Sequence, residues 1–168
     1  MMHTIKELIN KNKNSFTYIQ NNQNKTQEFF NLYDETSNFL ASFSSESIFI
    51  FLDGTYQSAA ILLACLSSEV RTHGYSHDFP LKEIDREIDL FNPKLIFIPR
   101  NIDSTYLSTN FVKERKLDID HFELFIDEKN ANSQKLAPKY IQSLIMRTSG
   151  STGFPKYLSI SEDIINKR

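Results

Sequence analysis

Residues 47–66 read Ser-Ile-Phe-Ile-Phe-Leu-Asp-Gly-Thr-Tyr-Gln-Ser-Ala-Ala-Ile-Leu-Leu-Ala-Cys-Leu. Ser47–Leu52 is a short, nearly continuous apolar run, which is typical of a strand that is buried on both faces. Asp53-Gly54 ends the run as a turn, and Thr55–Ser68 continues as a strongly apolar helix. Because a strand followed by such a helix begins a βαβ unit, the stretch predicts an α/β fold.

Strands and helices continue to alternate on both sides of this unit. Strands are expected at 15–20, 94–98, 121–126, 139–147 and 157–160, and helices at 2–11, 26–43, 80–91, 103–116 and from 161 onward. A short strand and a loop are expected within 69–79, and a polar linker within the domain at 127–138. The alternation predicts one domain, covering 1–168, with a mainly parallel sheet flanked by helices.

The composition narrows the classes of function. The chain has 19 basic and 21 acidic residues, so no basic excess indicates a nucleic-acid partner. Its longest apolar runs are about half the length that a bilayer-spanning helix needs, and the polar residues 1–14 do not resemble a signal peptide. The single cysteine, Cys65, lies in an apolar run and is expected to be a buried structural thiol. We therefore expect a cytoplasmic protein without a membrane span.

A second informative stretch follows an apolar strand. It consists of Thr148, Ser149, Gly150, Ser151, Thr152, Gly153, Phe154, Pro155 and Lys156. Glycines permit backbone conformations in which several N–H groups converge on one anion. The hydroxyl groups can donate hydrogen bonds to phosphate oxygens, and the lysine adds a positive charge. The sequence therefore predicts a phosphate-binding loop at 148–156.

Two common nucleotide-binding patterns do not fit this loop. The G-x-x-x-x-G-K-[ST] pattern needs glycine where Pro155 stands, and Ser or Thr where Tyr157 stands. The G-x-G-x-x-G pattern of dinucleotide-binding proteins is absent from the sequence. An ordinary Ser/Gly turn between two strands is the structural alternative.

The loop resembles the signature of the adenylate-forming superfamily, which includes acyl-CoA synthetases, nonribosomal peptide adenylation domains and luciferases of the firefly type. The pattern T-S-G-[ST]-T-G-x-P-K-G matches Thr148 to Lys156 at every specified position, and Tyr157 replaces the glycine that follows. Phe16-Thr17-Tyr18, the unit at 48–66 and the segment 93–98 resemble earlier family segments in the same order. The resemblance implies the N-terminal portion of such an enzyme.

This resemblance implies an AMP-forming carboxylate ligase. In such an enzyme a carboxylate attacks the α-phosphate of ATP, which gives an acyl-adenylate and releases pyrophosphate. The acyl group then passes to the thiol of coenzyme A or of a carrier protein. The loop at 148–156 would hold the β- and γ-phosphates, and Mg²⁺ would neutralise the same charge. The family's later motifs are not in this sequence, so catalytic residues stay unassigned and turnover is expected only with the missing segments. A split enzyme completed by a second chain and a non-catalytic nucleotide-binding or assembly module are the alternatives.

Two further groups of polar residues are interpreted as solvent-exposed. His73 and His77 flank Gly74, with Asp78 nearby, and a solvated loop is favoured over a metal site. The charged residues of Lys82–Asp89 are interpreted as the solvated face of a helix.

Overall fold

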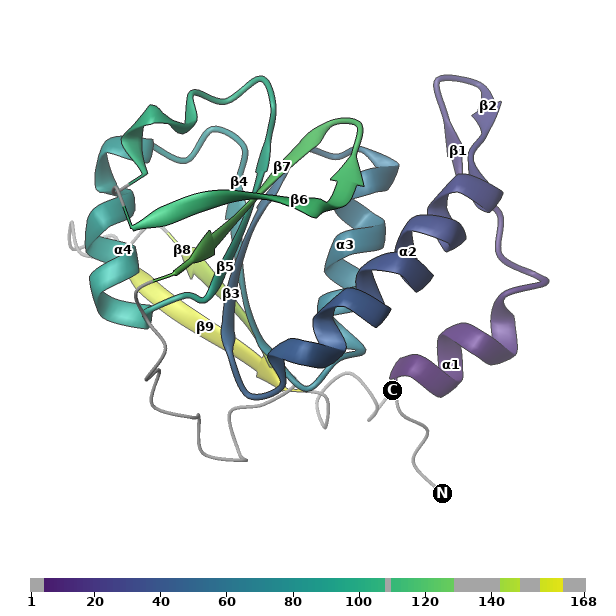
Figure 1. Ribbon diagram of the computed structural model, residues 1–168. Coiled ribbons are helices and arrows are strands. Elements are labelled where there is room, and N and C mark those ends of the chain that lie inside the picture. The colour runs from purple at the N-terminus through teal and green to yellow at the C-terminus, as the bar shows by residue number, and fades with distance from the viewer. Residues whose placement is uncertain (1–4, 108–109, 129–142, 149–154, 162–168) are drawn as a thin grey trace.

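The computed structural model describes residues 5–107, 110–128, 143–148 and 155–161 (Figure 1). The helices are α1 (Ile5–Asn12), α2 (Thr26–Leu40), α3 (Tyr56–Leu66) and α4 (Ile84–Phe91), with 3₁₀ turns at Ala41–Phe43, Leu81–Glu83 and Ser104–Tyr106. The strands are β1 (Ile19–Gln20), β2 (Gln23–Asn24), β3 (Ser47–Leu52), β4 (Arg71–Ser76), β5 (Leu95–Pro99), β6 (Phe111–Ile119), β7 (Phe122–Asp127), β8 (Ser143–Thr148) and β9 (Lys156–Ser161).

Seven of these strands form one mixed sheet in the order β6-β7-β5-β3-β4-β8-β9, while β1 and β2 form a separate hairpin. The central strands β5, β3, β4 and β8 are parallel to one another. At the two edges the pairing is antiparallel, between β5 and β7, β7 and β6, and β8 and β9. The predicted α/β fold is confirmed, and the parallel arrangement holds for the centre of the sheet but not for its edges.

Helices cover both faces of the central strand β3. Ile48 and Ile50 belong to the core shared with α2 and α3, whereas Phe49 and Phe51 belong to the core shared with α4. All four side chains are fully buried, as expected for a strand without a solvent-facing side. Figure 1 shows α2 and α3 on one side of the sheet and α4 on the other.

The turn after β3 is held by its own side chains. Asp53 Oδ1 accepts hydrogen bonds from the Thr55 backbone N–H at 3.0 Å and from the Thr55 hydroxyl at 2.6 Å. Thr55 Oγ1 in turn caps α3 by accepting from the Ser58 N–H at 3.3 Å. Gly54 supplies the left-handed backbone conformation, with φ at +79°. The predicted turn is confirmed. Cys65, farther along α3, is completely buried, which raises the pKa of its thiol to about 12.

The helix predicted at 103–116 is wrong. Of the residues described in this segment, only Ser104–Tyr106 are helical, as one 3₁₀ turn, and β6 begins at Phe111. β6 pairs with the next strand, β7, placing Val112 opposite Ile126, so cross-strand pairing overrides the helical pattern of the local sequence. The strand predicted at 15–20 is reduced to Ile19–Gln20.

Two other predictions concern residues that the structure does not describe. The linker expected at 127–138 lies outside the described residues from 129 onward, and so does the helix expected after 161.

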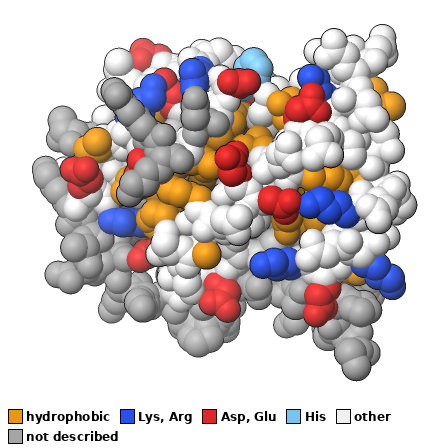
Figure 2. All heavy atoms as spheres, turned by 45° about the vertical axis from the view of Figure 1, so that its right-hand side comes forward, with side chains coloured by type: hydrophobic (Ala, Val, Ile, Leu, Met, Phe, Trp, Pro, Cys, Tyr) orange, Lys and Arg blue, Asp and Glu red, His pale blue; other side chains and the backbone are white. Residues whose placement is uncertain are grey.

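The described surface has no single dominant charge on the face shown in Figure 2. Acidic and basic side chains are interspersed there among neutral ones and among apolar patches. Among the described residues, no helix combines the length and the apolar character that crossing a membrane requires.

His73 is a buried residue of β4, so its assignment to a solvated loop is wrong. Its side chain is 1% exposed, and its ring lies 4.3 Å from that of Phe91 and 5.2 Å from that of Phe49. Neither ring nitrogen has a hydrogen-bond partner among the described residues. Burial lowers the pKa of His73 to about 3, because the charged imidazolium is poorly solvated there. His77, by contrast, is exposed, and the described residues form no group of three metal ligands.

The buried His73 predicts a loss of stability in acid. Its pKa falls from 6.5 in the unfolded chain to about 3 in the fold, so the unfolded state binds more protons below pH 6.5. Between pH 6.5 and 4.5 the wild type should lose about 2.5 kcal/mol of unfolding free energy relative to His73→Leu, at roughly 1.4 kcal/mol per pH unit. Urea unfolding of both proteins across this range measures the difference. Parallel pH profiles would contradict a neutral, buried His73.

Candidate functional site

The predicted phosphate-binding loop joins β8 to β9. Thr148 ends β8 and pairs directly with Lys156, which begins β9 and has an exposed side chain. The remaining predicted site residues lie between them, outside the described part of the chain: Ser149, Gly150, Ser151, Thr152 and Gly153. The structure therefore places the two ends of the loop side by side, as the base of a hairpin.

This hairpin base lies at the carboxyl edge of the parallel strands. β8 runs parallel to β4 with Met146 beside Gly74, and β4 ends with Ser76 beside Leu52 at the end of β3. Continuing the register places Thr148 next to Ser76 on the same edge. The chain leaves β3 and β4 toward opposite faces, and open α/β sheets bind ligands at the edge where this happens. The loop thus emerges where the fold favours a ligand.

A buried carboxylate fixes the two strands just inside the loop. Glu87 on α4 is 1% exposed, which corrects the interpretation of Lys82–Asp89 as a wholly solvated face. Its Oε1 accepts a hydrogen bond from the Tyr157 hydroxyl at 2.8 Å, and its Oε2 accepts from the Tyr75 hydroxyl at 3.0 Å. Arg147 Nε lies 3.7 Å from Oε1. Since a buried carboxylate is tolerated only with such partners, this cluster must form as a unit.

Arg147 and Tyr157 are opposite each other in the pair next to Thr148 and Lys156. Arg147 Nη2 forms an ion pair with Glu83 Oε2 at 2.7 Å, and its guanidinium lies 5.0 Å from the centre of the Phe79 ring. The Arg147 side chain is thus engaged with α4 and its preceding turn. Lys156 is the described cation that stands at the loop itself.

The tyrosines of the cluster remain hydrogen-bond donors. Burial, reinforced by the Glu87 carboxylate, raises the pKa of Tyr157 to about 12 and raises that of Tyr75 as well. The ring of Phe91 meets that of Tyr157 edge-on at 5.0 Å. Sequence reasoning did not find this cluster. Its one signal was Tyr157, which stands where the resembled pattern has glycine.

Comparison with known proteins relates the chain to solved structures by fold. No protein-family model matches it, and no curated protein sequence does. The complex of VinN with 3-methylaspartate matches with a TM-score of 0.64 and 14% identity over 96% of this chain and 48% of VinN. CmiS6 matches with a TM-score of 0.59 and 12% identity over 82% of this chain and 32% of CmiS6. IdnL1 matches with a TM-score of 0.56 and 12% identity over 77% of this chain and 28% of IdnL1.

These identities establish a shared fold and nothing finer. The chain spans less than half the length of each of these three structures. VinN has also been solved with L-aspartate, and that complex matches with a TM-score of 0.60.

Removal of the Tyr157 hydroxyl should loosen the hairpin. Tyr157→Phe deletes one hydrogen bond to the buried Glu87 carboxylate while Tyr75 and Arg147 remain, so we expect the unfolding free energy to fall by about 1–2 kcal/mol. Tyr106→Phe is the matched control, because Tyr106 is 53% exposed, and its change should stay below about 0.5 kcal/mol. Chemical denaturation measures both. Equal effects of the two substitutions would argue against the described role of Glu87.

Proposed function

We propose that this chain is the N-terminal portion of an ATP-dependent, AMP-forming carboxylate ligase whose loop at 148–156 binds the triphosphate of ATP. The observation that carries the proposal is the position of the loop's ends. Thr148 and Lys156 are paired at the carboxyl edge of the parallel strands, with Lys156 exposed there. The fold alone would be compatible with many functions. The proposal therefore depends on this position together with the signature-like sequence between the two residues.

In this proposal the loop acts on the leaving group. A carboxylate oxygen of the substrate forms a bond to the α-phosphorus of ATP, and the bond from that phosphorus to the bridging oxygen of the β-phosphate breaks. Negative charge then develops on pyrophosphate, where backbone N–H groups, hydroxyls and the Lys156 ammonium would stabilise it. Arg147 does not contact the phosphates in this proposal. Its ion pair with Glu83 holds the end of β8, from which the loop starts.

The proposed Mg²⁺ fits this chain only together with the nucleotide. The described residues gather no group of three acidic, histidine or cysteine ligands. Mg²⁺ is commonly held by substrate phosphates with one or two carboxylates, so here it would enter with ATP and neutralise phosphate charge. No catalytic residue for the chemical step is assigned within this chain.

The fold neighbours guide the choice of acid and the extent of the enzyme. VinN binds 3-methylaspartate and L-aspartate, so amino acids of this type are the first carboxylic acids to test. Because the chain covers about half of VinN, we infer that turnover needs further segments, supplied in the same polypeptide or by a second chain. Coenzyme A or a carrier-protein thiol is the proposed acceptor. The single, buried Cys65 is compatible with a reducing, cytoplasmic location.

The chain spans only 48% of the length of VinN. A chain of this extent could instead be a non-catalytic nucleotide-binding or assembly module, which is the second candidate function. Such a module would bind ATP through the same loop. It would not support exchange with any acid, even after the missing segments are supplied.

Substitutions in the loop should weaken ATP binding. Lys156→Ala removes a charge-assisted contact and should raise the dissociation constant about tenfold or more. Gly150→Val should act in the same direction, by restricting the backbone of the loop. Lys6→Ala, in the exposed part of α1, is the control and should leave the affinity unchanged. Isothermal titration calorimetry measures all four proteins. Wild-type affinity in both loop variants would remove the loop from the proposal.

The chain by itself should bind ATP but should not catalyse ATP–pyrophosphate exchange. With L-aspartate, 3-methylaspartate or other carboxylic acids, we expect no ATP–pyrophosphate exchange above background, since the proposal assigns the catalytic residues to other segments. A radiolabelled-pyrophosphate assay at saturating ATP and Mg²⁺ tests this. Exchange by the 168-residue chain alone would show that those segments are not needed.

A further inference from the structure

The two edges of the seven-stranded sheet differ in how they are protected. β9 forms one edge and β6 the other, and among the described strands each pairs with a single neighbour, β8 or β7. An edge strand presents a row of backbone N–H and C=O groups to which another strand can bind, and proteins usually protect this row with charges, bulges or covering segments. The side chains and the register of each edge therefore indicate whether it can accept another strand.

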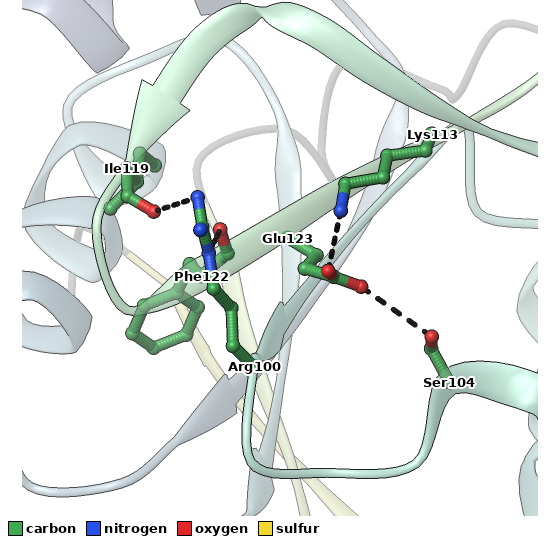
Figure 3. Close-up of polar contacts among 6 residues, drawn as sticks. All are labelled: Arg100, Ser104, Lys113, Ile119, Phe122 and Glu123. Atoms are coloured by element: carbon green, nitrogen blue, oxygen red, sulfur yellow. Dashed lines mark hydrogen bonds and ion pairs between the residues drawn. The ribbon is translucent and has the colours of Figure 1, made fainter.

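The β6 edge is protected by charge and by irregular pairing. Five of the nine residues of β6 are charged, and its register with β7 shifts between Glu114 and Ile119. The end of the strand is held by Arg100, as Figure 3 shows, which donates from Nη2 to the Ile119 carbonyl at 3.2 Å and from Nε to the Phe122 carbonyl at 3.3 Å. These features oppose the addition of a strand beside β6.

The β9 edge differs from the β6 edge in both respects. Lys156 is the single charged residue of β9 and stands at its first position, and the strand contains no proline. Its register with β8 is regular over all six pairs, from Lys156 opposite Thr148 to Ser161 opposite Ser143. The rest of β9, Tyr157–Ser161, therefore forms a regular and uncharged edge, which is the kind of edge that accepts a further strand.

Exposed apolar side chains lie beside the β9 edge. Leu158 is 54% exposed and Met146 is 38% exposed, and the two residues are directly opposite each other in the β8–β9 pair. Ile160 is partly buried and is on the same face as Leu158, two residues along the strand. A strand added beside β9 would cover Leu158 and Ile160, and the burial of this apolar surface would favour its addition.

The charge pattern of β9 favours a second copy of the chain as the added strand. In antiparallel pairing about a two-fold axis at Ser159, Leu158 of each copy lies opposite Ile160 of the other. The two Lys156 residues are then at opposite ends of the interface, roughly 20 Å apart, where salt screens their repulsion. Parallel pairing in register would instead place them side by side. β9 is thus complementary to itself in the antiparallel orientation.

We propose that two copies of this chain associate through antiparallel pairing of their β9 strands, which extends the sheet across the dimer. Backbone hydrogen bonds and the contacts between Leu158 and Ile160 form the interface. Because a single pair of six-residue strands is a small interface, we expect a weak dimer with a dissociation constant of roughly 10–100 µM. The inference does not rest on the proposed function, since it concerns association of the chain and not ATP binding.

Sedimentation velocity tests the proposal. Over about a hundredfold range of concentration, up to about 0.5 mM, the wild type should change from monomer to dimer. Leu158→Lys places a charge against Ile160 of the other copy and should raise the dissociation constant at least tenfold. Val112→Lys is the matched control, because Val112 is 44% exposed on the other edge strand, and dimerisation should be unchanged. A wild type that stays monomeric throughout, or equal dimerisation of Leu158→Lys, would overturn the proposal.

Cysteine cross-linking tests the register without adding a charge to the interface. Ser159→Cys places two thiols at the two-fold axis, where opposite Cα atoms are about 4.5–5.5 Å apart, within the range that a disulfide spans. The native Cys65 is completely buried. Mild oxidation should therefore give a covalent dimer of Ser159→Cys but little of Ser42→Cys, which alters an exposed serine after α2. Equal cross-linking of the two variants would contradict the proposed pairing.

Discussion

The burial of β3 on both faces is the constraint on which this fold depends. Ile48 and Ile50 need apolar cover on one side of the sheet, and Phe49 and Phe51 need it on the other. A single helical layer could not satisfy both pairs, so α2 and α3 pack on one face and α4 on the other. The connections after β3 and β4 then leave the sheet in opposite directions. The hairpin base of the loop lies along the carboxyl edge that results.

The Glu87 cluster is the polar counterpart of this apolar arrangement. A carboxylate that is 1% exposed is unfavourable by itself, and Tyr75, Tyr157 and Arg147 compensate for its burial. Hydrogen bonds have stricter geometry than apolar contacts. The cluster therefore fixes the positions of β8 and β9 relative to α4. It thereby fixes the positions of the two ends of the loop, Thr148 and Lys156. Apolar packing alone would permit more variation at this edge of the sheet.

Features of the fold and the site that depend on local sequence patterns were predictable from the sequence, whereas features that depend on tertiary contacts were not. Ser47–Leu52 was predicted within its observed bounds because its pattern is strong and local. β6 was missed because its run of charged residues, Lys113 to Lys116, resembles a solvated helix, and only pairing with β7 makes it a strand. Glu87 was missed for a similar reason. Its partners lie 12 and 70 residues away, at Tyr75 and Tyr157, so nothing near it in the sequence distinguishes it from neighbouring acids.

Tyr157, which stands where the resembled pattern has glycine, is compatible with the proposed phosphate-binding loop because of the pleat of β9. Successive side chains of a strand point to opposite faces, so Tyr157 and Lys156 are directed to different sides of the sheet. The Tyr157 hydroxyl is held by Glu87 on the α4 side. A glycine at this position would give more freedom to the backbone next to Lys156, whereas tyrosine anchors it. Compared with glycine, tyrosine thus reduces backbone freedom and fixes the end of the loop, next to the exposed Lys156.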